Sequence, residues 1–420
     1  MKLLLAPWGN PTFWKELYYK FDRKKVRSRT SLKILQETIK PDKTLIVGLD
    51  TLAKIGSNYE EVKKDAERKI KEHVNKFELE KCEIHIAPGI GSFPNGTFLG
   101  EALDYYYYTL AKISINLLKW LGNTLEIYFD LTHGINYSVI LTYRAVKEIL
   151  ELFSIFKKVK FKAYNADPSP VNTTKKLFIN VIEDIEPSPK PFDEKINQGR
   201  TLEPKDLDPE DRRKLFKEDL SCTKEVSKSE ISAFLGALYN GCPLAIFRFY
   251  PDKDKLDKII HQTLHTYAKY VNLENRDKLT VKRNVRFGKD FKVYLFAYLT
   301  VSLLEKSNLL DTNKKEVNIS ELKNLTSNLF KFDERFKTRI EKDIHSLKKD
   351  LDDKDIRDWK IYNEVLERSV GEPDSRNFLA HSGFERNIVE VKKSSPDVVF
   401  IRYREEKIST IKDLCQKGLR

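Results

Sequence analysis

Arg376, Asn377 and His381 stand close together near the end of the chain, in the run EPDSRNFLAHSG at residues 372–383. Imidazole is the side chain whose ordinary pKa suits proton removal near neutral pH. A guanidinium matches the charge and planar geometry of a phosphate, and it can stabilise extra negative charge on phosphorus. These groups would suit cleavage of RNA by its own 2′-hydroxyl, which needs no metal ion and leaves a 2′,3′-cyclic phosphate.

A helix would have to position these groups, and the local sequence supplies its start. Asp374 or Ser375 is a suitable N-cap. Arg376 and Asn377 would then lie in the first turn, where free backbone N–H groups favour an anion. Because residues four apart share a helix face, we expect Asn377 to hold the imidazole of His381 in one tautomer. An Arg and a His at this spacing also occur by chance on protein surfaces, so spacing alone leaves both interpretations open.

A second group of polar residues, DLTHGIN at residues 130–136, follows a short apolar run. Asp130 would end a strand, and Thr132 and His133 could hydrogen-bond a phosphate or a ribose. Gly134 would let the backbone approach a ligand, and Asn136 could open the next helix. The same residue types would also suit an ordinary turn between a strand and a helix.

The first 185 or so residues alternate short apolar runs with helix-length amphipathic segments. The expected strands are residues 2–6, 44–49, 83–87, 125–129, 160–164 and 177–182. The expected helices lie near residues 12–38, 58–78, 98–121 and 136–156. Most of the strand runs are apolar without alternation, which is typical of a parallel sheet covered on both faces. We therefore expect a Rossmann-like α/β domain over residues 1–185.

Ligands bind such a sheet at the carboxyl ends of its strands, and three of these ends are rich in small and polar residues. They contain Trp8, Gly9 and Asn10, then Gly89, Gly91 and Ser92, and finally the 130–136 run. Gly89 and Gly91 do not complete a dinucleotide-binding glycine motif, because Pro94 would spoil the helix start. A tight turn is an equally good interpretation of these two glycines.

The second half of the chain has a different character. Residues 186–215 hold prolines at positions 187, 189, 191, 204 and 209 among dense charges, which predicts a linker. From 216 to 420 the helical period dominates, so we expect an α-helical domain there. Its expected helices include segments near 253–271, 290–307, 318–351 and 354–370, and strand candidates are scarce until 398–403.

Composition narrows the classes of function. The 420 residues carry a formal net charge of +13, which suits an anionic partner such as nucleic acid. The four cysteines are scattered, which favours a reducing cytoplasm over a disulfide framework or a zinc site. The amino-terminal apolar run is too short for a signal peptide, and the apolar run 291–304 is too short for a membrane span. We expect a cytoplasmic protein without a membrane segment.

Two basic clusters could contact phosphates. The cluster 282–289 is the better candidate for RNA binding through Arg283, Arg286 and Lys289, because it lies in the expected helical domain with Phe287 between its charges. The cluster 23–29 has the sequence RKKVRSR, and such a run of charges usually lies on a solvent-exposed face. The four tyrosines 105–108 would face all sides of a helix, which predicts packing in a core or a dimer.

The pattern Arg376-Asn377-x-x-x-His381 resembles the R-x4–6-H signature of HEPN ribonucleases, and residues 130–136 resemble the D-x-[ST]-H-G-x-[NR] motif of CARF domains. Together they make the chain similar to the CARF–HEPN accessory ribonucleases of type III CRISPR systems. The resemblance implies a homodimer that cleaves single-stranded RNA and has no resident cofactor. It also implies activation by a cyclic oligoadenylate, with cyclic tetra-adenylate favoured, bound by the three loops at the sheet edge.

Three other functions remain open on the sequence. A helix-turn-helix hidden in residues 220–280 would make the chain a nucleotide-sensing DNA-binding regulator. The N-terminal pocket could instead degrade its own cyclic activator. An unregulated ribonuclease toxin would cut RNA with or without a ligand.

Overall fold

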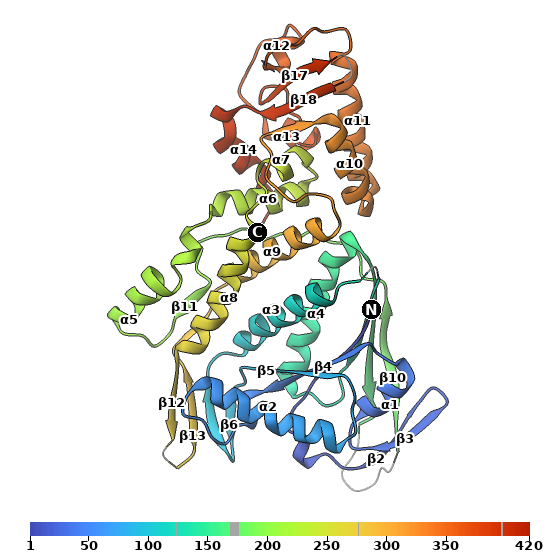
Figure 1. Cartoon of the computed structure of the whole chain (residues 1–420), viewed down its shortest axis with the longest axis vertical. Helices are drawn as coiled ribbons and strands as arrows, with labels where there is room; N and C mark the ends of the chain where they lie inside the picture. Colours follow the sequence, from blue (N-terminus) through green and yellow to red (C-terminus); the bar gives the residue numbers. More distant parts are fainter. Residues whose placement is uncertain (123, 169–175, 276, 396–397) are drawn as a thin grey trace. The chain divides into compact units, whose positions relative to one another are not determined.

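The computed structural model describes residues 1–122, 124–168, 176–275, 277–395 and 398–420. The chain forms two compact units (Figure 1). The N-terminal unit contains Met1–Ser188, Thr201–Leu220 and His261–Gly288. The C-terminal unit contains Pro189–Arg200, Ser221–Ile260 and Lys289–Arg420. The segments 201–220 and 261–288 therefore belong to the N-terminal unit. The sequence predicts a linker over 186–215 and a helical domain from 216 onward.

The N-terminal unit is built on an eight-stranded sheet with the order β3-β2-β10-β9-β8-β1-β4-β5. Strands β9, β8, β1, β4 and β5 are parallel to one another, whereas β10 runs antiparallel to β9. The strand bounds are β1 (Lys2–Pro7), β2 (Leu17–Phe21), β3 (Lys24–Ser28), β4 (Lys43–Leu49), β5 (Cys82–Ala87), β8 (Thr124–Asp130), β9 (Lys158–Ala166) and β10 (Lys176–Ile185). Every strand expected in this region is present.

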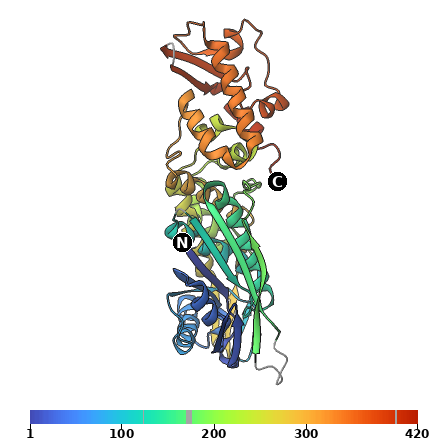
Figure 2. The same ribbon diagram turned by 90° about the vertical axis from the view of Figure 1, so that its right-hand side faces the viewer.

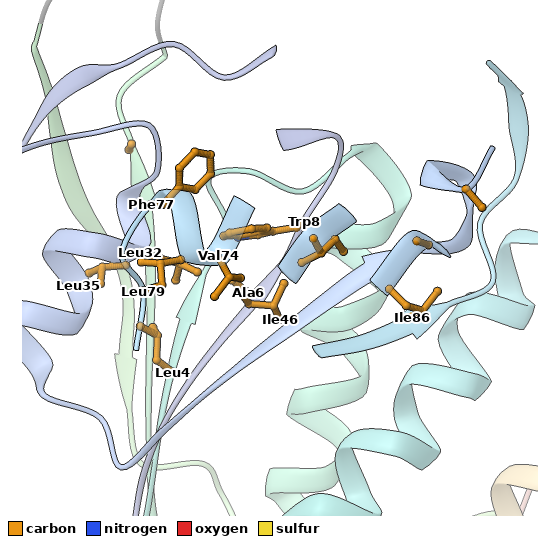
Figure 3. Packing of buried hydrophobic residues seen from close by; sticks show 14 of the residues in the cluster. Leu4, Ala6, Trp8, Leu32, Leu35, Ile46, Val74, Phe77, Leu79 and Ile86 are labelled. Carbon is orange, nitrogen blue, oxygen red and sulfur yellow. The ribbon is translucent and has the colours of Figure 1, made fainter. Parts of the chain in front are cut away.

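Helices cover both faces of this sheet (Figure 1). Their bounds are α1 (Ser31–Ile39), α2 (Tyr59–Lys76), α3 (Ala102–Trp120) and α4 (Asn136–Phe156). Figure 3 shows one face, where Leu4, Ala6 and Trp8 of the β1 segment meet residues of α1 and α2 such as Leu32 and Val74. Burial of these apolar side chains is the main force that holds the layers together. The tyrosines at 105–108 are buried in α3, as the core interpretation predicts.

The prediction of a helix near residues 12–38 is wrong over most of that range. The chain there forms a 3₁₀ turn (Pro11–Phe13), then the hairpin β2–β3, and only then α1. In β2 the buried Tyr19 stands between the exposed Tyr18 and the partly exposed Lys20, a strand period of two. Asp22 adopts a positive φ of 53° at the hairpin turn.

Further strands of the N-terminal unit lie outside the main sheet, and Figure 1 shows β12, β13 and β6 to the left of α2. A four-stranded sheet has the order β12-β13-β7-β6, and β11 pairs with β14. Their bounds, with that of α5, are β6 (Gly91–Phe93), β7 (Gly96–Leu99), β11 (Leu202–Pro204), α5 (Pro209–Lys214), β12 (Val271–Asn275), β13 (Leu279–Arg283) and β14 (Val285–Phe287). Strands β12 to β14 were not expected from the sequence. Strand β13 pairs on one side with β12 in a local hairpin and on the other side with β7, which is far away along the chain.

The C-terminal unit is mainly helical, and Figure 2 shows it in yellow-green, orange and red. Its helices are α6 (Lys228–Asn240), α7 (Pro243–Arg248), the first part of α8 (Lys253–Lys269), α9 (Asp290–Lys306), α10 (Ile319–Leu329), α11 (Glu334–Leu351), α12 (Tyr362–Val365), α13 (Ser375–Ala380) and α14 (Ile408–Cys415). A small sheet has the order β15-β18-β17-β16, with β15 (Glu316–Asn318), β16 (Lys360–Ile361), β17 (Val389–Ser395) and β18 (Val398–Tyr403).

Two helix predictions in this unit need correction. The segment expected as one helix at 318–351 is two helices, because a new N-cap at Asp333 begins α11. The helix expected at 354–370 is reduced to the single turn α12. Within the described ranges, no helix is both long enough and apolar enough to cross a membrane.

Candidate functional sites

Helix α13 and the residue that follows it contain the predicted catalytic residues. The Oδ1 atom of Asp374 accepts a hydrogen bond of 2.8 Å from the backbone N–H of Asn377, which caps the helix as the sequence predicts. Phe378 is fully buried and anchors the helix, while Arg376 and Asn377 are exposed. His381 is the first residue after the helix, and its N–H still donates to the carbonyl of Asn377 at 3.0 Å.

The imidazole of His381 is held by Asp343 on α11. This partner of the histidine was not predicted from the sequence. His381 Nδ1 lies 3.2 Å from Asp343 Oδ1. Asp343 Oδ2 accepts a second hydrogen bond of 2.9 Å from the Ser382 hydroxyl. Asn377 therefore does not take the orienting role expected of it. A carboxylate acceptor at Nδ1 favours the tautomer that keeps Nε2 unprotonated and able to accept a proton.

A tight turn after α13 fixes the position of this pair. Ser382 and Gly383 both have positive φ, 52° and 81°. The N–H of Gly383 donates to the carbonyl of Phe378 at 2.9 Å. A Cβ atom on Gly383 would lie 2.7 Å from the hydroxyl of Tyr403, so no larger residue fits without movement. Arg339 supports the turn from α11 by donating to the Ser382 hydroxyl at 3.1 Å.

A cavity of about 360 Å³ opens beside the imidazole. Asn377, His381 and Asp343 line it together with the cationic residues Lys342 and Arg386. Arg376 is exposed next to this group and is not among the lining residues. The lining thus combines two cations with the carboxylates of Asp343 and Glu385. Nothing in the sequence pattern of α11 distinguishes Lys342 and Asp343 from other charged residues on a solvated helix.

In the N-terminal unit, Asp130 and Thr132 hold the loop that follows β8. Asp130 is buried and accepts hydrogen bonds of 2.6 Å from both the Ser31 and the Thr132 hydroxyls. Burial raises the pKa of this carboxyl, and the hydroxyl contacts work against that shift. The Thr132 hydroxyl also accepts from the N–H of Ala166 at 3.1 Å. These two side chains have internal partners that shape the loop.

His133 occupies the centre of the same loop. Its ring stacks on Trp14 with 4.0 Å between centroids, and its Nε2 lies 3.3 Å from the N–H of Ser31. Burial lowers the pKa of His133 to about 3, so the ring is neutral near pH 7. Because Nε2 accepts from a backbone donor, the ring proton sits on Nδ1. The histidine can therefore offer a neutral N–H donor to a ligand.

The loop after β1 packs directly against this one. The N–H of Gly9 donates to the carbonyl of His133 at 2.8 Å. A Cβ on Gly9 would lie 2.7 Å from Ile135 Cγ2, and one on Gly134 would lie 2.2 Å from Val139 Cγ2. Asn10 is exposed, as is Asn136 at the start of α4. Trp8 is fully buried in the core, so it supports this edge from beneath and presents no surface to a ligand.

The third loop is held by an ion pair that the sequence analysis did not foresee. Asp50, which follows β4, accepts from the N–H of Gly89 at 2.7 Å and is paired with Arg283. Arg283 also donates to the carbonyl of Gly89 at 2.9 Å. Gly91 and Ser92 follow in β6 and are exposed. The polar groups of Gly89 are thus fixed by two charged side chains.

These contacts correct the RNA-binding prediction for Arg283. The residue is 2% exposed and its side chain is already paired, so it is not free to contact a phosphate. Phe287 is buried as well and cannot stack on a base. Arg286 is exposed but pairs with Glu203 at 2.8 Å, and Lys289 is exposed at the start of α9. Arg283 and Arg286 belong to strands of the N-terminal unit, not to a helical domain.

The chain is 32% identical over 417 residues to the CRISPR system endoribonuclease Csx1 of Methanocaldococcus jannaschii, which covers 93% of this chain and 86% of that relative. The chain belongs to the Csx1 family. Csx1 family models match it twice, the CARF domain at residues 3–168 and the HEPN domain at residues 333–405. This chain is therefore a CARF–HEPN endoribonuclease of the CRISPR type, as its two motifs suggest. Asp343 and His381 both fall within the Csx1 HEPN match, and the loops after β1, β5 and β8 fall within the Csx1 CARF match.

Two solved structures show a weak likeness to this Csx1-family chain. Protein VC1899 of Vibrio cholerae has a TM-score of 0.23 at 10% identity, over 73% of this chain and 67% of its own. Csm6 of Enterococcus italicus, bound to cyclic hexa-2′-fluoro-hexa-dAMP, has a TM-score of 0.26 at 11% identity, over 100% of this chain and 92% of its own. TM-scores of this size do not establish a common fold.

Proposed function

We propose that this Csx1-family chain cuts single-stranded RNA by metal-independent attack of the 2′-hydroxyl, and that a cyclic oligoadenylate bound to its CARF domain switches this activity on in type III CRISPR antiviral defence. The observation that carries the proposal is the pairing of His381 with Asp343 beside a cavity whose lining includes Lys342 and Arg386. This arrangement has the base, the orienting carboxylate and the positive charge that the reaction needs.

The reaction follows from the position of the imidazole. Nε2 of His381 takes the proton of the ribose 2′-hydroxyl, and O2′ attacks the adjacent phosphorus. Arg376 stabilises the negative charge that builds on the phosphate oxygens, and Asn377 hydrogen-bonds the same group. The bond from phosphorus to O5′ breaks, and O5′ leaves with a proton. The products are a 2′,3′-cyclic phosphate and a 5′-hydroxyl end.

The leaving O5′ requires a second proton donor, since His381 has just become protonated by the attacking hydroxyl. A homodimer with two α13 helices facing each other would supply a second imidazole for this step. Arg286 and Lys289 are exposed cations, and we keep both as proposed contacts to the RNA backbone; Arg286 would have to exchange its pairing with Glu203 for a phosphate.

The activator site is the carboxyl edge of the N-terminal sheet. Neutral His133 offers a donor there, and Gly9 and Gly134 bring the backbone close together, beside the exposed Asn10, Ser92 and Asn136. Such a lining of neutral donors suits the phosphates and ribose hydroxyls of a cyclic oligoadenylate, with cyclic tetra-adenylate as the favoured ring. The ring must bind the active state better, and a coupling of about 2–3 kcal/mol changes activity about 30- to 150-fold.

The test is cleavage of a labelled single-stranded RNA in EDTA, with and without cyclic tetra-adenylate, for the wild-type protein and His381→Ala. We expect ligand-dependent cutting by the wild type, none by the variant, and product ends that carry a 2′,3′-cyclic phosphate. Cutting that persists in His381→Ala would show that other residues perform the chemistry. Equal cutting with and without the ring would remove the activator from the proposal and leave an unregulated ribonuclease.

A further inference from the structure

The free edge of the N-terminal sheet carries a face that neither proposed site uses. It is formed by β3, β2 and the first residues of β10, which are neighbours in the sheet (Figure 1). Tyr18 pairs with Arg27 and Lys176, and Lys20 pairs with Lys25 and Phe178. Because cross-strand partners point to the same side, these six residues share one face. We call Tyr18, Lys20, Lys25, Arg27, Lys176 and Phe178 the basic–aromatic face.

The opposite side of the same strands is core. Tyr19 and Leu177 are buried there, with Val26 packed against the same cluster, and α1 contacts β2 and β3. On the basic–aromatic face, by contrast, Tyr18 is 38% exposed and Phe178 is 49% exposed. Tyr18 and Phe178 stand diagonally opposite each other on neighbouring strands, and exposed apolar surface rimmed by charged residues is a feature of interaction sites.

Lysines surround both rings. The Nζ atom of Lys25 lies 4.0 Å from the centroid of Tyr18, and Nζ of Lys176 lies 4.6 Å from that of Phe178. Nζ of Lys20 lies 5.7 Å from the Phe178 ring on the neighbouring strand. A base that stacks on either ring would therefore have an ammonium group within reach of its phosphate.

The charges of this face are poorly balanced within the protein. Arg27 pairs with Glu16 at 2.7 Å, but no carboxylate among the described residues pairs with Lys20, Lys25 or Lys176. Lys20 and Lys25 stand directly opposite each other, and like charges in that position destabilise a sheet. The Lys20 side chain beside it also lowers the pKa of Lys176. An anion bound between these lysines would relieve the repulsion.

We propose that the basic–aromatic face binds a single strand of the RNA substrate outside the active site, with bases stacked on Tyr18 and Phe178 and phosphates held by Lys20, Lys25 and Lys176. Exposed aromatics on a sheet flanked by cations recognise unpaired bases, whereas the bases of a duplex are already stacked on each other. The proposal rests on the ribonuclease activity of the family and does not depend on the activator. It gives the 23–29 cluster, expected from sequence to be a merely solvated face, a role in substrate capture.

The experiment measures binding of a fluorescent 20-nucleotide single-stranded RNA to the full chain in EDTA, by anisotropy at several salt concentrations. His381→Ala is the background for every protein, so that the RNA stays intact. The test variants are Lys25→Glu with Lys176→Glu, and separately Phe178→Ala. The matched control is Lys64→Glu with Lys71→Glu on α2, two exposed lysines whose reversal changes the net charge by the same amount.

We expect the Lys25/Lys176 variant to weaken RNA binding at least about tenfold and to reduce the slope of log affinity against log salt by about 1.4, at about 0.7 per lost contact. Phe178→Ala should weaken binding about five- to 100-fold. The control should stay within about twofold of the background protein. Thermal unfolding of each variant verifies that the fold is intact.

Unchanged RNA binding in both test variants would overturn the proposal, as would a loss equal to that of the control. Binding of cyclic tetra-adenylate and light scattering are measured on the same proteins. If the variants lose the cyclic ring but keep the linear RNA, the face belongs to the activator. If they lose their oligomeric state instead, the face is an interface between copies. Failure of the activation proposal would leave the RNA-binding result standing, so the two are distinguishable.

Discussion

His381 and Asp343 are 38 residues apart in the sequence, yet Nδ1 of the imidazole lies 3.2 Å from a carboxylate oxygen of the aspartate. The aspartate side chain is only 13% exposed and the imidazole is 59% exposed. The carboxylate of Asp343 is thus largely buried, whereas a substrate can reach the imidazole of His381. We therefore propose that Asp343 positions the imidazole and that His381 transfers the proton.

Replacing Asp343 tests that division of roles. Asp343→Asn should lower kcat about 10- to 100-fold while KM changes little, because a general base contributes about 100- to 10,000-fold and the variant keeps the imidazole. Asp343→Glu should recover part of the loss. Glu341→Gln, an exposed substitution on the same helix, serves as the control. Equal effects on kcat and KM, or no effect at all, would show that Asp343 does not orient the histidine.

The buried Asp50–Arg283 pair should matter for stability far more than a surface pair. Arg283→Met leaves the Asp50 carboxylate buried without its cation, which costs about 3–5 kcal/mol of unfolding free energy. Arg286→Met removes an exposed partner of Glu203 and should cost at most about 1 kcal/mol. Urea denaturation of both variants gives the comparison. Similar midpoints for the two would contradict the structural role given to Arg283.

His133 should make the N-terminal unit less stable in mild acid. Its pKa is about 3 in the fold and 6.5 in the unfolded chain, so between these values only the unfolded state binds the proton. The free energy of unfolding that the neutral His133 contributes is fully present above pH 6.5, and it is lost as the pH falls toward 3. At pH 5 the loss is about 2 kcal/mol, from about 1.5 pH units at 1.36 kcal/mol each.

His133→Gln removes this titration and keeps a hydrogen-bond acceptor for Ser31. The stability difference between wild type and variant should therefore shrink as pH falls from 7.5 to 5, by about 2 kcal/mol. Thermal or urea unfolding without ligand measures it. Other buried groups, such as His85, titrate equally in both proteins and cancel. A difference that stays constant with pH would mean that the pKa of His133 is the same in the folded and the unfolded chain.

Gly134 should be intolerant of even one added carbon. A Cβ there would lie 2.2 Å from Val139 Cγ2 of α4 and 3.3 Å from the backbone oxygen of Pro7, so Gly134→Ala must displace either the Val139 side chain or the loop itself. We expect cyclic tetra-adenylate to bind at least about tenfold more weakly, a change of about 1.4 kcal/mol. Gly122→Ala, where a Cβ meets nothing within 4 Å, is the control. Wild-type affinity in Gly134→Ala would remove this loop from the ligand site.

The local sequence determined much of the architecture. Apolar runs between amphipathic segments predicted the strands of the main sheet, because a strand buried on both faces has to be apolar throughout. The N-cap of α13 could also be predicted from the sequence, because an N-cap contact joins residues only three apart, here Asp374 and Asn377. The two motifs indicated the family to which the chain belongs.

The tertiary structure decided which side chains meet across long stretches of chain. Asp343 replaced Asn377 as the partner of His381, and Arg283 became a buried partner of Asp50 although it belongs to a basic cluster in the sequence. Charged residues on a solvated helix and charged residues in a site look alike along the chain. Contacts between side chains on distant elements leave no local pattern in the sequence. A helix cap, by contrast, is a contact between residues three apart, and the faces of a strand alternate with a period of two.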